Sequence, residues 1–464
     1  MKTEDRTERP TMDETGHRTG RRSDLIAAAA GVLLVTVAVL VGRSIQDADG
    51  SLYVHWPPLL ASWHPHTGPG TPAAVVVAAA VVAYGPSLAD RIRRRALLPA
   101  AWAASLAWVL SLALIDGWGR GITERLTTKH EYLQAIDRFQ NIGAALRSFD
   151  DHILLGSPDN WPTHVAGHPP GATLTFVLLD RIGLGGGAWA GVWCIVVGSS
   201  AVPAALVALR ALADERLARR AAPFLVLAPV AVWTGTSADA YFAAVAAWSV
   251  ALLALAATRS VRLPRAAAFA SGLLFGLTCY LSYGLTLIAV LLLAVLVLAR
   301  TARPLPLLLA GALVAPVLFT LAGYNWWEGY RLLVERYYQG AGGFRPYSYW
   351  VWANLACTTI AAGLATVAGL RRATAGAPGA VRALRTGTTC ASQRLILLTL
   401  MALLALLAAD LSGMSKAETE RIWQPFILWL LPAAALLPTG TRRGWLTAQA
   451  VVALLVNHLL WTGW

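Results

Sequence analysis

The sequence predicts an all-α, polytopic transmembrane helical bundle, and three observations support this prediction. The chain of 464 residues is 56% hydrophobic but only 14% charged, whereas about a quarter of the residues in a soluble domain are charged. Apolar runs of membrane-spanning length recur along the whole sequence. The basic residues behind the net charge of +13 are gathered in alternate gaps between these runs. In such positions they orient spans rather than bind nucleic acid.

The first 24 residues are polar and mixed in charge, which is typical of a disordered cytoplasmic tail. No small-residue cleavage site follows the apolar run 25–41, so we expect a retained first span rather than a signal peptide. Residues 25–464 then form one transmembrane domain of about thirteen spans, each needing about 20 apolar residues. The expected spans are 25–42, 72–89, 97–115, 186–209, 221–236, 240–257, 266–283, 285–299, 304–323, 350–369, 394–410, 425–438 and 444–461.

One alternating set of gaps is basic throughout, which places it in the cytoplasm by the positive-inside rule. The N-terminal tail falls on the same side and the C-terminus on the other. The arginines that define these six gaps are Arg91, Arg93, Arg94 and Arg95; Arg210, Arg216, Arg219 and Arg220; Arg259, Arg262 and Arg265; Arg300 and Arg303; Arg371, Arg372, Arg382, Arg385 and Arg394; and Arg442 and Arg443. The opposite gaps are rich in Trp, Tyr, His, acids, Pro and Gly. Interfacial aromatic belts explain only the Trp and Tyr, so we expect a functional site on the extracytoplasmic face.

The longest outer segment, residues 116–187, carries most of these polar side chains. Within it, residues 131–149 place apolar side chains at helical spacing with charged ones between them, which predicts an amphipathic helix at the membrane interface. Pro169 and Pro170 then fix an extended turn. The apolar stretch 172–179 that follows predicts a second juxtamembrane helix.

The residue types of this face suit sugar transfer from a phospholipid carrier. Such a reaction needs a carboxylate to take the proton from the acceptor hydroxyl and cations, arginine above all, against the departing phosphate. Both groups must meet at the membrane surface because the tail of the carrier stays in lipid. The outer segments contain carboxylates and arginines, and their histidines add titratable groups.

Several short motifs resemble the GT-C membrane glycosyltransferases, most closely the protein-mannosyltransferase/aminoarabinose-transferase branch. In that branch an Asp-Glu pair precedes an amphipathic helix, and a basic residue precedes a Pro-Pro turn. The matching segments here are His130-Glu131-Tyr132, the turn 167–171 and the turn 236–242. Residues 335–340 and 418–423 resemble segments of uncharacterised actinobacterial membrane proteins of the same superfamily.

The chain also departs from that pattern. His130 replaces the usual catalytic Asp, and His168 stands where the branch has Lys. The long outer loop follows the third span instead of the first, so we interpret the first two spans as an added hairpin.

The resemblance implies a membrane glycosyltransferase that moves a sugar from a polyprenyl-phosphate-linked donor to a glycan, lipid or protein acceptor on the extracytoplasmic face, inverting the anomeric centre. Membrane lipid is the other expected partner, and no cofactor is expected. Glu131 is the first candidate for the catalytic base and Asp116 is its rival. The candidates for substrate binding are His130, Tyr132, His164, His168, Asp239, Arg336, Tyr337, Glu420 and Arg421.

Each candidate also has a purely structural interpretation. Glu131 then is an ordinary acid at a helix N-terminus, Asp116 ends a span, and Arg421 forms an ion pair within its loop. Asp239 lies in a turn so short that we expect it to be buried, and an acid at such depth is usually functional. Neither the four cysteines nor the histidines near Trp56 and Trp63 have metal-ligand spacing, so we expect no metal site. Some GT-C members do use a metal, and Glu131 with Asp116 or Asp239 could supply ligands for a divalent cation.

Two other functions remain open. A transporter or flippase for a lipid or small solute places ionisable residues near the membrane midplane, in broken helices. Here the span centres are almost free of charge, which weighs against transport. A non-catalytic envelope-assembly protein is the third interpretation, because the usual Asp is absent at position 130.

Overall fold

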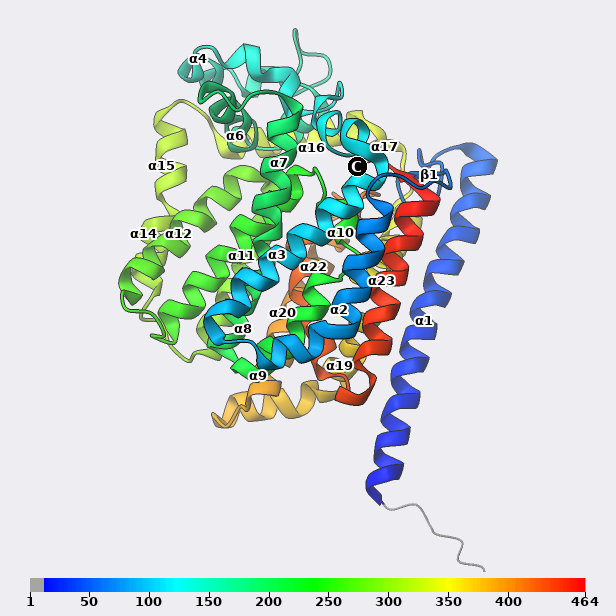
Figure 1. Cartoon of the computed structure of the whole chain (residues 1–464). Helices are drawn as coiled ribbons and strands as arrows, with labels where there is room; N and C mark the ends of the chain where they lie inside the picture. The colour runs from blue at the N-terminus through cyan, green and yellow to red at the C-terminus, as the bar shows by residue number, and fades with distance from the viewer. Residues whose placement is uncertain (1–11, 464) are drawn as a thin grey trace, which may run out of the picture.

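The computed structural model describes residues 12–463, with side chains from Gly20 onward, and is an almost wholly helical bundle (Figure 1). The first half contains α1 (Met12–Asp49), β1 (Ala61–Trp63), α2 (Thr71–Arg91), α3 (Arg94–Ala113), η1 (Leu114–Asp116), η2 (Gly119–Thr123), η3 (Arg125–Thr127), η4 (Tyr132–Phe139), α4 (Ile142–Arg147), η5 (Asp150–His152), α5 (Thr163–Gly167), α6 (Pro170–Arg181), α7 (Gly186–Ser199), α8 (Ala201–Leu212), α9 (Glu215–Val226), α10 (Ala231–Thr234) and α11 (Ala238–Ala257).

The second half contains α12 (Pro264–Leu281), η6 (Tyr283–Leu287), α13 (Ile288–Leu298), α14 (Leu305–Ala312), α15 (Val314–Leu321), α16 (Trp326–Gln339), α17 (Ala341–Phe344), α18 (Tyr347–Ala362), α19 (Leu364–Thr386), α20 (Ala391–Leu411), α21 (Thr419–Ile422), α22 (Gln424–Leu430), η7 (Leu431–Leu436), η8 (Thr439–Thr441), α23 (Arg442–Leu459) and β2 (Leu460–Thr462).

Six helices in the described residues are long and apolar enough to cross a membrane, or up to eight if each of two bent pairs is one span. The six are Gly20–Asp49, Thr71–Arg91, Arg94–Asp116, Gly186–Leu212, Ala238–Ala257 and Ala391–Leu411. The prediction of a helical bundle with several spans is therefore confirmed, whereas the number of about thirteen is not. Several expected spans are shorter or interrupted. For example, the stretch 221–236 is divided between α9 and α10.

The two sets of gaps lie at opposite ends of the bundle. Figure 1 shows α4, α6, α16, α17, β1 and the C-terminus at one end, and α9 and the outer part of α19 at the other. We call the first the site end, and the second, which carries the arginine-rich gaps, the basic end. The alternation that the sequence predicts is thus present in the fold, while the assignment of the site end to the extracytoplasmic face stays a prediction.

Two predicted segments differ from the structure. Helix α1 begins at Met12, so no boundary appears at residue 24, and residues 1–11 of the predicted tail lie outside the described part. The single amphipathic helix expected over 131–149 is wrong: a 3-10 helix, η4, is followed by the short helix α4. Asn141 separates the two and caps α4 by accepting a hydrogen bond from Ala144 N at 3.0 Å, a role that its short polar side chain favours over the helix interior.

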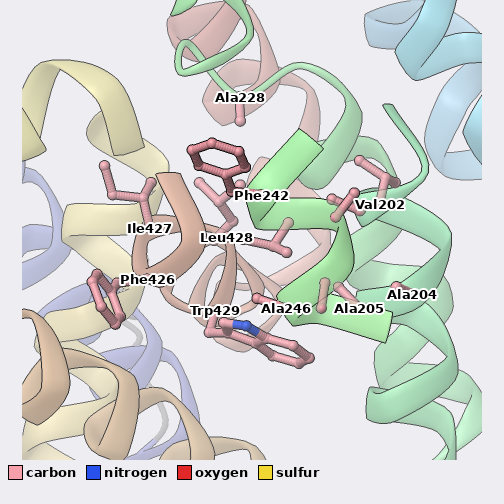
Figure 2. Close-up of a cluster of buried hydrophobic side chains, with 14 of the residues drawn as sticks. Val202, Ala204, Ala205, Ala228, Phe242, Ala246, Phe426, Ile427, Leu428 and Trp429 are labelled. Carbon is pink, nitrogen blue, oxygen red and sulfur yellow. The ribbon is translucent and has the colours of Figure 1, made fainter. Parts of the chain in front are cut away.

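Small residues allow close helix packing in the interior. Figure 2 shows Val202, Ala204 and Ala205 of α8, Phe242 and Ala246 of α11, and Phe426, Ile427, Leu428 and Trp429 of α22 in one buried cluster. Helix α11 is buried along most of its length. Close contact between backbones through Ala and Gly is the usual mode of helix association where lipid surrounds the bundle.

Two helix breaks inside the bundle are closed by glutamine side chains. Gly363 (φ 78°) separates α18 from α19. There Gln449 donates to Ala362 O at 2.9 Å and accepts from Ala365 N at 3.2 Å. Near α10, Gln424 donates to Trp233 O at 2.8 Å and accepts from Thr234 Oγ1 at 2.9 Å. The backbone groups freed by the breaks thus find partners within the protein, as backbone inside a membrane must.

Candidate functional site

Glu131 lies directly before η4 and is completely buried, with an exposed fraction of 0%. His164, on α5, places its Nδ1 2.9 Å from Glu131 Oε1. The two segments are held side by side because His164 N donates to His130 O at 2.9 Å and the His130 ring lies 2.9 Å from Thr163 Oγ1. Oε2 of Glu131 has no hydrogen-bond partner among the described residues. A buried carboxylate oxygen with unused lone pairs is a candidate proton acceptor.

Tyr132 and His168 extend the site. The Tyr132 hydroxyl lies 3.0 Å from His168 Nδ1, and burial raises the pKa of Tyr132. Burial also lowers the pKa of His168 to about 4, so its imidazole is neutral at pH 7. The predicted Pro-Pro turn is confirmed: His168 and Pro169 are extended and α6 begins at Pro170. A Cβ on Gly171 would lie 2.5 Å from Tyr280 O, so glycine is needed for the close approach of α6 to α12.

Asp239 and Arg421 form the charged part of the site. Asp239, in the first turn of α11, is 5% exposed, as expected from its short turn. Arg421 Nη1 lies 2.6 Å from Asp239 Oδ2, and its Nη2 lies 3.1 Å from Glu418 Oε2. Burial lowers the pKa of Arg421, but the carboxylates of Asp239, Glu418 and Glu131 outweigh burial and raise it. Glu131 therefore belongs to the same electrostatic cluster.

The segment that carries Glu418 and Arg421 is held in an unfavourable conformation. Residues 412–423, which we call the site loop, join α20 to α22. Ala417 and Glu418 have positive φ values of 75° and 61°, a region that residues with a Cβ seldom adopt. Lys416 compensates by donating to Gly342 O at 2.7 Å, and Arg345 donates to Lys416 O at 2.7 Å. Strain held in place by surrounding contacts is typical of functional segments.

Glu420 is also in the site loop but forms no ion pair with Arg421 among the contacts of the described residues. It is fully buried, and its electrostatic neighbours include the backbone of Leu60 and the Cys357 thiol. Burial raises the pKa of Glu420 to about 7. Thr419 next to it donates to Asn354 Oδ1 at 3.4 Å. These contacts make Glu420 a support of the site loop.

Asp116 contacts a different set of residues from this cluster. It ends the span Arg94–Asp116, as predicted, and lies 2.8 Å from His66 Nε2, 3.2 Å from Arg120 Nε and 2.7 Å from Arg125 Nη2. Both arginines also donate to the carbonyl of Thr462, each at 3.1 Å. Asp116 thus ties the C-terminal strand β2 to the site end. An acid with both oxygens engaged is a poor candidate for a catalytic base.

Arg336 and Tyr337 also lie outside the cluster. Arg336 donates to Trp161 O at 3.3 Å and Asn160 Oδ1 at 3.5 Å, and so holds the 160–161 segment. Tyr337 packs on Gly342. The structure therefore brings together six candidates, namely Glu131, Tyr132, His164, His168, Asp239 and Arg421, with His130 beside them. Glu418 completes the cluster, and its three-residue spacing from Arg421 was the signal that could have placed it there.

No group of three or more His, Cys, Asp or Glu side chains suited to a metal ion occurs among the described side chains, which run from Gly20 to Gly463. The absence of a metal requirement stays a prediction.

Comparisons with known proteins add little to this picture. No protein-family model matches the chain, and no curated protein matches it. Its structure is similar to the Archaeoglobus fulgidus oligosaccharyltransferase in the apo form, with a TM-score of 0.49 and 12% identity over 79% of this chain and 56% of that one. The same enzyme tethered to an acceptor peptide containing the NVT sequon gives a TM-score of 0.43 and 13% identity over 74% and 49%. This chain thus spans about half the length of that enzyme.

Proposed function

We propose that this protein is a membrane glycosyltransferase of the GT-C type, which transfers a sugar from a polyprenyl-phosphate-linked donor to an acceptor on the extracytoplasmic face. The observation that carries the proposal is the convergence of Glu131, His164 and Arg421 from distant parts of the chain at one end of a membrane-spanning bundle. Buried charges are costly in such a protein. Their accumulation at the site end is therefore better explained by chemistry than by stability.

In this proposal Glu131 is the base. It takes the proton of the acceptor hydroxyl as the oxygen attacks the anomeric carbon, the bond to the phosphate oxygen breaks, and that oxygen leaves with the electron pair. His164, 2.9 Å away, orients the carboxylate. The neutral His168 and the Tyr132 hydroxyl supply hydrogen-bonding groups for sugar hydroxyls. Inversion of the anomeric centre follows from a single displacement.

Arg421 is the cation proposed to receive the donor phosphate. It is already paired with Asp239 and Glu418, so phosphate binding requires it to exchange one of these carboxylates. Glu418 is the one to yield, because its carboxylate lies 3.1 Å from Arg421 whereas that of Asp239 lies 2.6 Å away. Since Glu131 is fully buried, the acceptor also needs the site to open. Both requirements call for a rearrangement around the cluster during the reaction.

The test is to offer purified protein in liposomes a panel of polyprenyl-phosphate sugars and measure release of the polyprenyl phosphate. The proposal expects one donor to be consumed in the presence of an acceptor fraction from the cell envelope. If none of the donors is bound or consumed, the glycosyltransferase assignment fails.

One observation favours the transporter as the second candidate. The breaks at Gly363 and around α10 are discontinuous helices within the bundle, which transporters use to bind substrates. Against this, the side chains at the breaks are Gln449 and Gln424, which are engaged with the backbone. Transport of the lipid-linked sugar across the liposome membrane without its cleavage would favour this alternative.

A further inference from the structure

Beside the site end, helix α1 and helix α23 line an apolar groove of about 280 Å³. One face of α1 and one face of α23 form its walls, α18 its floor, and the turn before β1 its upper end. Representative lining residues are Val35, Thr36, Trp56, Leu59, Ile360 and Leu455. Figure 1 shows α1 standing along the side of the bundle next to α23.

Helix α1 is attached to the rest of the bundle at two places along its length, so the groove does not arise from a helix that is detached from the bundle. Near its start, Asp24 is paired with Arg372 at 2.7 Å and with Arg371 at 3.3 Å. Near the site end, Ala38 O accepts a hydrogen bond from Tyr349 at 2.8 Å. The groove lies alongside the second attachment, in a span whose residues are mostly exposed to the surroundings.

The lining selects a hydrocarbon rather than water or a polar solute. Its two threonine hydroxyls are satisfied within their own helices: Thr36 donates to Val32 O at 2.9 Å and Thr359 donates to Leu355 O at 2.8 Å. The remaining walls are mainly aliphatic side chains and prolines. A polar occupant would find few partners here and would lose its hydrogen bonds to water.

The depth and the mouth of the groove point to a lipid of one leaflet. The residues of α1 that line it extend from Val32 to Val39, a rise of roughly 10 Å at 1.5 Å per residue, against about 15 Å for half of the hydrocarbon core. At the mouth, Arg43 lies 4.1 Å above the ring of Trp56. Basic and aromatic side chains at the ends of spans typically contact lipid headgroups.

We infer that this groove binds one acyl chain of an anionic phospholipid from the leaflet at the site end, with the headgroup at Arg43. The lipid fills the gap between α1 and α23 and fastens the first span to the bundle. This inference is independent of the glycosyltransferase proposal.

The experiment is native mass spectrometry of the full chain in mild detergent with phosphatidylglycerol as the probe. Thr36→Trp fills the groove from α1, and its matched control is Val37→Trp, the next residue, which is exposed but does not line the groove. Leu455→Trp and Val451→Trp form the same pair on α23. Because the groove is filled from two different helices, the test remains valid if one of the variants fails to fold.

The wild type and both controls should retain one phosphatidylglycerol molecule. The groove-filling variants should bind it on the order of tenfold more weakly, because excluding even two methylene groups of the acyl chain from the groove has about that effect. Arg43→Gln should reduce the preference for phosphatidylglycerol over phosphatidylcholine with the same chains. Equal retention in Thr36→Trp, Leu455→Trp and wild type would overturn the inference. So would displacement of the lipid by a polyprenyl phosphate that binds more tightly, because the occupant is then the carrier.

Discussion

Arg421 at the site end differs from Arg219 and Arg220 at the basic end in its burial and in the groups that it binds. At the basic end, arginines donate to backbone carbonyls at helix ends: Arg219 to Ala89 O and Arg220 to Leu437 O, both at 2.6 Å. At the site end, Arg421 is 5% exposed and bonds two carboxylates instead. Arg219 and Arg220 thus satisfy orphan carbonyls at the basic end and are partly exposed. Arg421 is buried with its carboxylates, which is costly, and the proposed chemistry accounts for that cost.

The largest expected effect comes from Glu131→Gln at the site end. If Glu131 is the base, transfer should slow by a factor of about 10² to 10⁴, while donor binding survives because glutamine keeps the size and polarity of the side chain. Glu124→Gln, an exposed acid in the same outer segment, is the matched control and should transfer at the wild-type rate. Equal rates in the two variants would remove Glu131 from the mechanism.

The second comparison removes one carboxylate from an arginine at each end. Asp239→Asn removes the nearest carboxylate partner of buried Arg421, and should lower the free energy of unfolding by on the order of 3 kcal/mol. At the basic end, Asp90→Asn removes the carboxylate that lies 3.2 Å from Arg442. The side chain of Asp90 is 51% exposed. The substitution should have almost no effect. Denaturant unfolding in detergent measures both, and similar losses would contradict the contrast between the ends.

The third prediction concerns the pH dependence of stability through Glu420. Its pKa is about 7 in the folded protein, above its ordinary value of 4.5, because of burial. The folded state therefore holds a proton that the unfolded state loses between pH 4.5 and 7, and stability falls as pH rises through this range, by roughly 3 kcal/mol.

Glu420→Gln should abolish this part of the decline. His168, with a folded pKa of about 4, acts in the opposite direction by losing stability as pH falls below about 6.5. His168 is present in both wild type and Glu420→Gln, so its contribution to the free energy of unfolding cancels when the two proteins are compared. Parallel stability curves for wild type and Glu420→Gln from pH 4.5 to 7 would show that Glu420 is charged in the fold.

The smallest effect is expected for Arg443→Gln at the basic end. Arg443 is exposed and donates to Ala83 O at 3.0 Å, so its loss should change the free energy of unfolding by about 1 kcal/mol or less and leave transfer unchanged. A drop in transfer would mean that the basic end takes part in the reaction.

Much of the fold was predictable because a membrane constrains short stretches of sequence directly. Apolar runs and alternating arginines separated the two ends, and Pro169 and Pro170 correctly placed the start of α6. The helix expected over 131–149 failed because the apolar spacing did not show that Asn141 would end one element and cap the next. The breaks at Gly363 and near α10 were missed because the glutamines that close them come from distant helices.

The site was predicted less completely, since its partners are distant in sequence. The sequence named most members of the cluster as candidates but did not show their pairing: Asp239 meets Arg421 across 182 positions. The membrane face on which they lie stays a prediction. In the sequence, Asp116 was the rival of Glu131 for the role of base. Its engagement with His66 and Arg125, and through Arg125 with the C-terminal strand, depends on contacts that only the fold makes.

The most direct test of the central claim is sugar transfer by wild type and Glu131→Gln in the same liposomes, with Arg443→Gln as the variant of the basic end and donor binding measured in parallel. The account predicts that all three bind the donor, that wild type and Arg443→Gln transfer its sugar at similar rates, and that Glu131→Gln transfers little or none. Transfer by Glu131→Gln at the wild-type rate would contradict the claim that the buried cluster at the site end is the catalytic centre.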